Sequence, residues 1–254
     1  MEKILVFIEG QESSGEYIVI DEDNDISIVG MARPDIPYSA VHSIVSFNYK
    51  AEDGLDIPAL MTIPKTWDRK SKLPSVMLPH GGPASYDSMT FNWMAQAFAE
   101  QGYLVIQPQF RGSKGFGNKL TLAGYGEWGG KMQTDLIDAL AALVDKGIAD
   151  PNRACIVGSS YGGYAALAAG AFTSKTFKCI VSINGISDLT LMLNTEKKKF
   201  GKKHWIPSYW NKVLANTKDK KALLSDISPI NNIQNFTVPV LLIHAENDTV
   251  VPYE

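Results

Sequence analysis

The arrangement of apolar segments from residue 75 onward constrains the fold of this chain more than any other feature. Five apolar segments of strand length alternate with stretches that have helical spacing. The apolar segments are residues 75–80, 103–110, 154–159, 178–186 and 238–245, and the helical stretches are residues 92–100, 134–145, 164–171 and 188–225. Apolar strands separated by helices are typical of a mostly parallel sheet covered on both faces. We therefore expect a three-layer α/β domain at residues 41–254.

The segment before this domain has a different pattern. Residues 1–40 contain short runs of β-forming residues separated by Asp, Asn and Gly turns. Pro34 and Pro37 mark a boundary near the end of this segment. Residues 43–64 then predict two strands joined by a turn at Asp53 and Gly54. We therefore expect a small β-rich segment at residues 1–40, followed by the α/β domain.

Charge and hydropathy argue against several classes of function. The formal net charge of the 254 residues is −3, and the densest basic stretch, residues 197–203, is typical of a solvated face. We expect no nucleic-acid partner. No apolar run reaches the roughly 18 residues of a membrane-spanning helix, so we expect no membrane partner. The first residues lack a signal-peptide cleavage site, which favours the cytoplasm, or the periplasm if a signal peptide lies upstream.

The two cysteines, Cys155 and Cys179, lie in apolar segments of strand type. In such a setting a cysteine usually acts as a small core residue. We expect both thiols to be reduced, with neither a disulfide nor a metal site. We expect no cofactor and no bound metal.

Ser160 lies at the centre of the pattern G-x-S-x-G, between Gly158 and Gly162. An apolar strand precedes the pattern, and a run of small residues with helical character follows it. A serine hydroxyl is a weak nucleophile unless a base activates it, and a sharp turn from strand to helix exposes it for that purpose. The sequence therefore favours Ser160 as a catalytic nucleophile over a serine in an ordinary turn.

A glycine pair follows the first strand of the alternating region, in the sequence His80, Gly81, Gly82, Pro83. A loop of this kind can direct a backbone N–H towards the serine, and the N–H of the residue after the nucleophile, Tyr161, would be the second donor. His80 precedes the serine, and we expect it to shape the loop.

Asp248 comes just after the last apolar segment, at the sheet edge where catalytic groups of open α/β sheets collect. In the serine hydrolases of this architecture the triad order is Ser, then Asp or Glu, then His. We favour Asp248 as the acid over Glu246, for which we expect a solvated position in the turn.

Taken together, the stretches HGGP, RGSKGFG, GSSYGGY and HAENDTVVP resemble the prolyl oligopeptidase family of serine peptidases, most closely its acylaminoacyl-peptidase and dipeptidyl-peptidase-like branch. The resemblance covers residues 41–254. It implies an α/β-hydrolase fold, a preceding β-propeller whose last strands would be residues 1–40, and short peptides as substrates. It also implies Ser160 as nucleophile, Asp248 as acid, and Gly82 and Tyr161 as oxyanion-hole donors. The resemblance does not decide between a monomer and a homo-oligomer.

The histidine that this resemblance requires is missing from the expected place. The family's base follows the acid, whereas all four histidines of this chain precede Asp248. We therefore expect the chain to be a fragment of a longer enzyme, incomplete at its C-terminus and nearly inactive alone. A natural protein that has lost its base is the alternative.

Residues 188–224 contain no apolar strand and bring three aromatic side chains, Trp205, Tyr209 and Trp210, between two strands of the sheet. We expect these side chains to bind substrate, although they could instead only pack the insertion against the domain.

The leading hypothesis is a serine peptidase acting through an acyl-enzyme on Ser160. The alternatives are a carboxylesterase or lipase-like hydrolase and a non-catalytic interaction protein with the same fold.

Overall fold

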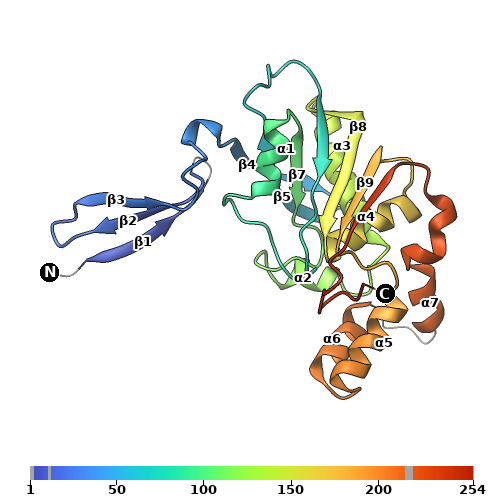
Figure 1. The fold of residues 1–254 in the computed structure, drawn as a ribbon. Coiled ribbons are helices and arrows are strands. Elements are labelled where there is room, and N and C mark those ends of the chain that lie inside the picture. Colours follow the sequence, from blue (N-terminus) through green and yellow to red (C-terminus); the bar gives the residue numbers. More distant parts are fainter. Residues whose placement is uncertain (1–2, 11–12, 215–219, 254) are drawn as a thin grey trace.

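The computed structural model describes residues 3–10, 13–214 and 220–253, which form two sheets and the helices around the larger one (Figure 1). The larger sheet has seven strands in the order β10-β9-β8-β6-β7-β5-β4. Its strands are β4 (Ser43–Lys50), β5 (Asp56–Ile63), β6 (Leu73–Met77), β7 (Leu104–Pro108), β8 (Ala149–Ser159), β9 (Cys179–Ile183) and β10 (Val240–Ile243). The five apolar segments became the five strands β6 to β10, and residues 43–64 became β4 and β5, so these predictions are confirmed.

The pairing within this sheet is mixed. The strands from β7 through β6, β8 and β9 to β10 are parallel to their neighbours, whereas β5 is antiparallel to both β7 and β4. Parallel strands end at the same edge of the sheet, and the loops after β6, β8 and β10 carry the residues that the sequence singled out. The topology therefore brings these loops together.

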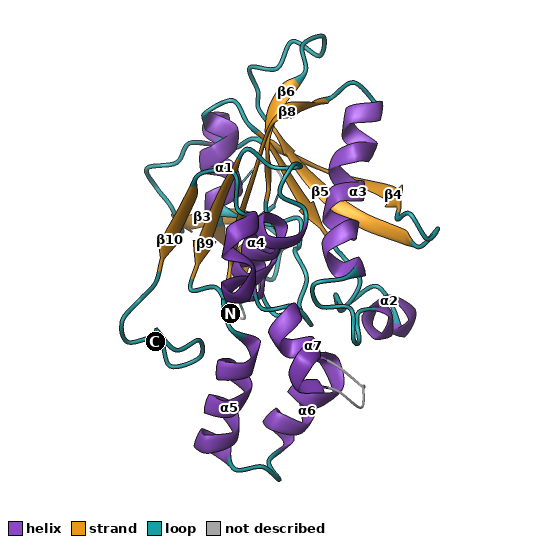
Figure 2. Ribbon diagram, turned by 90° about the vertical axis from the view of Figure 1, so that its right-hand side faces the viewer, coloured by secondary structure: helices purple, strands orange, loops and turns teal. Residues whose placement is uncertain are grey.

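Helices cover both faces of the sheet, as expected for three layers (Figure 2). On one face α1 (Trp93–Glu100) packs against Val76, Val105 and Val157. The other face carries α3 (Lys131–Asp145) and α4 (Tyr161–Phe172), with α2 (Asn118–Ala123) at its periphery. Helix α4 is buried from its first residue almost to its last because Gly and Ala dominate its sequence and let it approach the sheet closely.

The predicted helical stretch after β9 forms three helices beyond one end of the sheet (Figures 1 and 2). They are α5 (Leu189–Phe200), α6 (Trp205–Leu214) and α7 (Lys220–Asp226), and the short helix η2 (Pro229–Asn235) leads from them into β10. Asp188 caps α5 because its carboxylate accepts hydrogen bonds from the N–H groups of Thr190 and Leu191. Residues 215–219 of this stretch lie outside the described residues.

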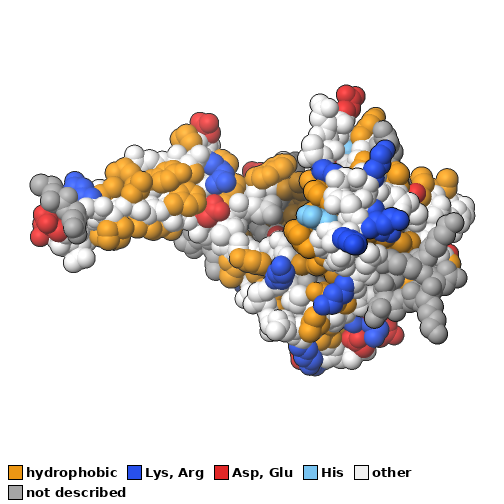
Figure 3. All heavy atoms as spheres, turned by 90° about the horizontal axis from the view of Figure 1, so that it is seen from below, with side chains coloured by type: hydrophobic (Ala, Val, Ile, Leu, Met, Phe, Trp, Pro, Cys, Tyr) orange, Lys and Arg blue, Asp and Glu red, His pale blue; other side chains and the backbone are white. Residues whose placement is uncertain are grey.

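The first part of the chain forms a separate antiparallel sheet of three strands, which we call the N-terminal arm. It consists of β1 (Ile4–Ile8), β2 (Glu16–Ile20) and β3 (Ile26–Met31), and the short helix η1 (Tyr38–Ala40) leads from it into β4. The arm projects away from the larger sheet (Figure 1), and apolar side chains lie along its surface (Figure 3). The predicted β-rich character of residues 1–40 is confirmed, and their assignment as a domain of their own stays a prediction.

The expectation for the cysteines was wrong. Cys155 and Cys179 are direct partners in the parallel pairing of β8 and β9, and a disulfide joins them. Their Cα atoms are 4.7 Å apart, a distance that a disulfide spans. The sequence showed two strands with one cysteine each, but not that these strands are neighbours in this register. The cysteines therefore give no support to a reducing compartment.

Among the described helices, none is long and apolar enough to cross a membrane.

Candidate active site

Ser160 occupies a strained turn between β8 and α4. Its φ is 57° and its ψ is −119°, in a region that a residue with a side chain seldom adopts. Two backbone hydrogen bonds hold this conformation: the N–H of Ser160 donates to the carbonyl of Ile183 (3.0 Å), and its own carbonyl accepts from the N–H of Tyr164 (3.0 Å). The Ser160 hydroxyl makes no hydrogen bond with any described residue and lines a cavity.

The glycines on either side of Ser160 are needed because backbones meet there. A Cβ atom on Gly158 would lie 2.2 Å from the carbonyl oxygen of Gly162, and a Cβ on Gly162 would lie 2.2 Å from that of Pro79. The strand, the helix and the loop after β6 therefore pack backbone against backbone. In this chain the G-x-S-x-G spacing is a packing requirement as well as a motif.

The loop with the glycine pair lies directly beside the serine. A Cβ on Gly81 would be 3.5 Å from Cβ of Ser160, and Gly82, with a φ of 127°, lines the same cavity as Ser160. Within the described part of the chain, neither the N–H of Gly82 nor that of Tyr161 donates a hydrogen bond. For Tyr161 this is expected, because the first N–H groups of a helix have no partner within it. Two free donors are thus placed near the hydroxyl.

His80 holds the glycine loop and has both ring nitrogens occupied. Nδ1 lies 2.8 Å from the carbonyl oxygen of Gly81, and Nε2 lies 2.8 Å from Oγ of Ser113. Because a carbonyl only accepts, Nδ1 carries the proton and Nε2 accepts from the Ser113 hydroxyl. The ring stacks on Phe110. Burial lowers the pKa of His80 to about 4, which the Gly81 carbonyl partly opposes, so the ring is neutral near pH 7.

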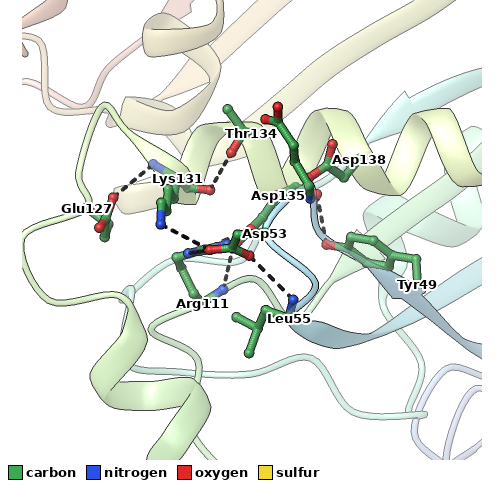
Figure 4. Close-up of polar contacts among 10 residues, drawn as sticks. Tyr49, Asp53, Leu55, Arg111, Glu127, Lys131, Thr134, Asp135 and Asp138 are labelled. Atoms are coloured by element: carbon green, nitrogen blue, oxygen red, sulfur yellow. Dashed lines mark hydrogen bonds and ion pairs between the residues drawn. The ribbon is translucent and has the colours of Figure 1, made fainter.

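The loop that supplies Ser113 is anchored by a network of charged groups (Figure 4). Arg111 is buried, and its Nη2 lies 2.7 Å from Oδ1 of the fully buried Asp135. The guanidinium also contacts Asp53, with Nη1 3.0 Å from Oδ2 of that carboxylate. Nζ of Lys131 lies 3.1 Å from the same oxygen. These cations, Arg111 first, hold the pKa of Asp53 well below its usual range. The network fixes the start of the RGSKGFG stretch beneath the glycine loop.

Asp248 lies after β10, held by its own turn. Oδ1 accepts hydrogen bonds from the N–H groups of Val250 (2.7 Å) and Val251 (2.9 Å), and these bonds lower the pKa of its carboxyl group. Oδ2 is 4.0 Å from Nε2 of His244, a nitrogen that also lies 3.0 Å from the Val251 carbonyl oxygen. Glu246 is exposed, as expected for a solvated turn residue.

None of the four histidines contacts Ser160 within the described residues. His80 and His244 have the partners given above. His42 pairs with Glu100 at 2.8 Å, and His204 stacks on Phe200 with ring centroids 5.1 Å apart. The structure thus gives Ser160 no imidazole partner from this chain.

The three aromatic residues expected to bind substrate all line the cavity that contains Ser160 and Gly82. This cavity has a volume of about 320 Å³ and lies between the serine turn, α5, α6 and the segment after β10. Trp205 is largely exposed, whereas Trp210 also packs edge-on against Trp128, with ring centroids 5.8 Å apart. For Trp210, lining the cavity and packing the insertion are therefore not alternatives.

Further cavity residues were not foreseen from the sequence. Met192, Glu196 and Lys199 line it from α5. Their spacing of four and three residues, which places them on one face of a helix, was the available signal. This spacing shows which residues share a helix face, but it does not show which cavity that face lines.

The comparisons with known proteins agree with this geometry. Residues 89–254 match the family model described as the prolyl oligopeptidase family. The chain belongs to the prolyl oligopeptidase family. It is 32% identical over 246 residues to dipeptidyl peptidase family member 6 of Caenorhabditis elegans, covering 85% of this chain and 32% of that relative. It is 34% identical over 213 residues to dipeptidyl aminopeptidase BIII of Pseudoxanthomonas mexicana, covering 78% of this chain and 30% of the relative. The chain thus spans about a third of the length of these relatives.

Solved structures of the family have the same fold. A puromycin-hydrolyzing peptidase of Mycobacterium tuberculosis matches with a TM-score of 0.84 at 26% identity, over 98% of this chain and 38% of that one. The acylaminoacyl peptidase of Pyrococcus horikoshii matches with a TM-score of 0.80 at 24% identity, over 100% of this chain and 40% of that one, which is a likeness of fold alone. The α/β-hydrolase fold is therefore confirmed, and the N-terminal arm is consistent with the end of a propeller.

Proposed function

We propose that this chain is the hydrolase part of a serine peptidase that cleaves short peptides through an acyl-enzyme on Ser160. The observation that carries the proposal is the strained turn that places the Ser160 hydroxyl at a cavity beside two unpaired backbone N–H groups. A turn of this kind costs free energy, and such strain persists mainly where it serves a function. The names of the relatives support a peptide as substrate.

In the proposed reaction, Oγ of Ser160 attacks the carbonyl carbon of the scissile bond while its proton passes to an imidazole. The N–H groups of Gly82 and Tyr161 stabilise the negative oxygen of the tetrahedral intermediate. The imidazole then protonates the leaving amine, and water hydrolyses the acyl-enzyme with the same base. Oδ2 of Asp248 orients the imidazole and stabilises its charged form.

We infer that this imidazole belongs to a histidine outside residues 1–254. His80 is unsuited to the role because both its nitrogens are engaged, and His244 lies against Val251. This chain covers about a third of the length of each relative, which is compatible with a histidine supplied by a part of the protein outside this sequence. On this proposal residues 1–254 alone hydrolyse peptides little or not at all.

The test is labelling of the full-length protein with a fluorophosphonate, which reacts with activated serines. We expect Ser160 to be labelled and Ser160→Ala to abolish both labelling and peptide hydrolysis. Ser159→Ala is the matched control, because the neighbouring Ser159 is exposed, and it should leave labelling intact. Labelling that persists in Ser160→Ala would show that another residue is the nucleophile.

A second measurement separates a peptidase from an esterase on the same scaffold. The kcat/KM values for a peptide anilide and for an ester with the same acyl group are compared. A peptidase hydrolyses the amide efficiently because its base delivers a proton to the leaving amine. Hydrolysis of the ester alone would contradict the proposal.

A further inference from the structure

The cavity beside Ser160 is mostly apolar, but Glu196 brings a carboxylate to it, and Lys199 lines it as well. Its apolar side chains come from α6, from α5 and from the segment after β10, and they include Met192, Trp205 and Val251. Glu196, on the face of α5 that bears Met192, is only 9% exposed. A buried carboxylate is costly unless a positive group or several hydrogen-bond donors meet it.

Within the described residues, Glu196 has no hydrogen bond and no ion pair. Lys199 lines the same cavity, but its Nζ donates to the carbonyl of Thr249 at 2.8 Å and lies 5.2 Å from the ring centre of Phe200. Burial raises the pKa of Glu196, and the neighbouring Lys199 and His204 only partly oppose this rise. The carboxylate oxygens of Glu196 are accessible from the cavity, so a charged group that enters the cavity can reach them.

The position of Glu196 limits what that group can be. Ser160 and Gly82 line the same cavity, so a group that enters it belongs to a substrate residue next to the bond that is cut. Aromatic walls such as Trp205 and Tyr209 can cover the aliphatic stem of a long side chain, and aromatic faces attract cations. A lysine or arginine side chain combines a stem and a positive end.

We propose that Glu196 binds a positively charged group of the substrate, so that the cavity selects peptides with a lysine or arginine side chain beside the scissile bond. This inference rests on the proposed function. The same carboxylate chemistry would bind the free amino group of a short peptide, and the experiment distinguishes these two sources of charge.

The experiment measures kcat/KM of the full-length protein on matched peptide anilides that differ only in lysine or norleucine before the scissile bond. Each peptide is used with a free and with an acetylated amino group. We expect the wild-type protein to prefer lysine by at least about tenfold with either amino terminus. In Glu196→Gln this preference disappears, because kcat/KM for the lysine peptides falls towards that for the norleucine peptides. Lys198→Gln, an exposed change on the same helix, keeps the preference.

The remaining outcomes are also informative. A preference that follows the free amino group and is lost in Glu196→Gln supports the role of the carboxylate and assigns the amino terminus as its partner. An unchanged preference in Glu196→Gln, or equal rates for lysine and norleucine in the wild type, overturns the inference. Fluorophosphonate labelling of Ser160 in each variant separates this failure from a failure of the proposed function, and Glu196→Asp, which keeps the charge, should retain part of the preference.

Discussion

At Ser160 a positive φ is held by backbone hydrogen bonds from β9 and α4, so the strain is borne by the scaffold and not by the side chain. The hydroxyl stays free to react. The same division holds at Asp248, where the turn itself binds Oδ1 and leaves Oδ2 for another group. In both places backbone hydrogen bonds fix the residue, and one side-chain oxygen has no hydrogen bond within the described residues.

His80 gives the first prediction. An asparagine amide can replace the Nδ1–H donor to the Gly81 carbonyl, whereas a glutamine amide is longer and resembles Nε2. We expect His80→Gln to lower kcat of the full-length protein on the order of tenfold through a loosened glycine loop, and His80→Asn to lower it less. Steady-state kinetics on one peptide substrate measure the difference.

The control for His80 is the pH dependence of stability. Its pKa of about 4 in the folded protein is below the ordinary value of 6.5. Between these values the unfolded chain binds a proton that the folded protein does not, so the free energy of unfolding falls as the pH drops from about 6.5 to 4. Urea unfolding at several pH values should show a smaller fall in His80→Asn. An identical fall would mean that His80 titrates normally in the folded protein.

For Asp248 we expect Asp248→Asn to lower kcat of the full-length protein on the order of 10⁴-fold, as in other triads. The fold should persist, because the amide oxygen can still accept from Val250 and Val251. Glu246→Gln is the matched control and should change kcat little, since Glu246 is exposed. The reverse result would identify Glu246 as the acid.

At the scale of elements, α6 presents two tryptophans to the cavity in different ways. Trp205 is 68% exposed, so Trp205→Ala should leave the free energy of unfolding within about 0.5 kcal/mol while changing the ranking of kcat/KM among peptides. Trp210 packs against Trp128 and Tyr209, so Trp210→Ala should also cost about 2 to 3 kcal/mol of stability. Denaturant unfolding and a small peptide panel test both. If Trp210→Ala loses stability and the ranking of kcat/KM is unchanged in both variants, these tryptophans only pack the insertion and do not select substrates.

The elements also show how far the sequence could lead. Strands and helices followed from apolar periodicity, and the serine turn followed from the glycines that its close backbone contacts require. Pairing between strands did not follow, because a single sequence has no signal for which strands become neighbours. The disulfide of Cys155 and Cys179 was therefore missed. Glu196 was missed for a similar reason, since the sequence does not show which cavity a given helix face lines.

At the scale of the whole molecule, apolar side chains are exposed on two surfaces of the described part of the chain. All four side chains of β10, one of the two edge strands of the larger sheet, are exposed. A cavity of about 670 Å³, bounded by α4, η2 and β10, lies beside this strand. The N-terminal arm also exposes apolar side chains along its length (Figure 3). Ile4, Leu5 and Ile26 are among the exposed residues of this arm. An exposed edge strand offers both unpaired backbone groups and apolar surface to another chain.

We therefore expect residues 1–254, expressed as such, to self-associate at micromolar concentration. Leu242 has the largest exposed fraction on β10, 67%, and a lysine there places a charge on the edge strand. Leu242→Lys should shift the sedimentation-velocity distribution towards the monomer. Leu122→Lys, at an exposed position on α2, should not do so. If both variants associate like the wild type, β10 is not the contact, and the same measurement on Ile4→Lys then examines the N-terminal arm. A wild-type chain that sediments only as a monomer would mean that these apolar surfaces do not drive association.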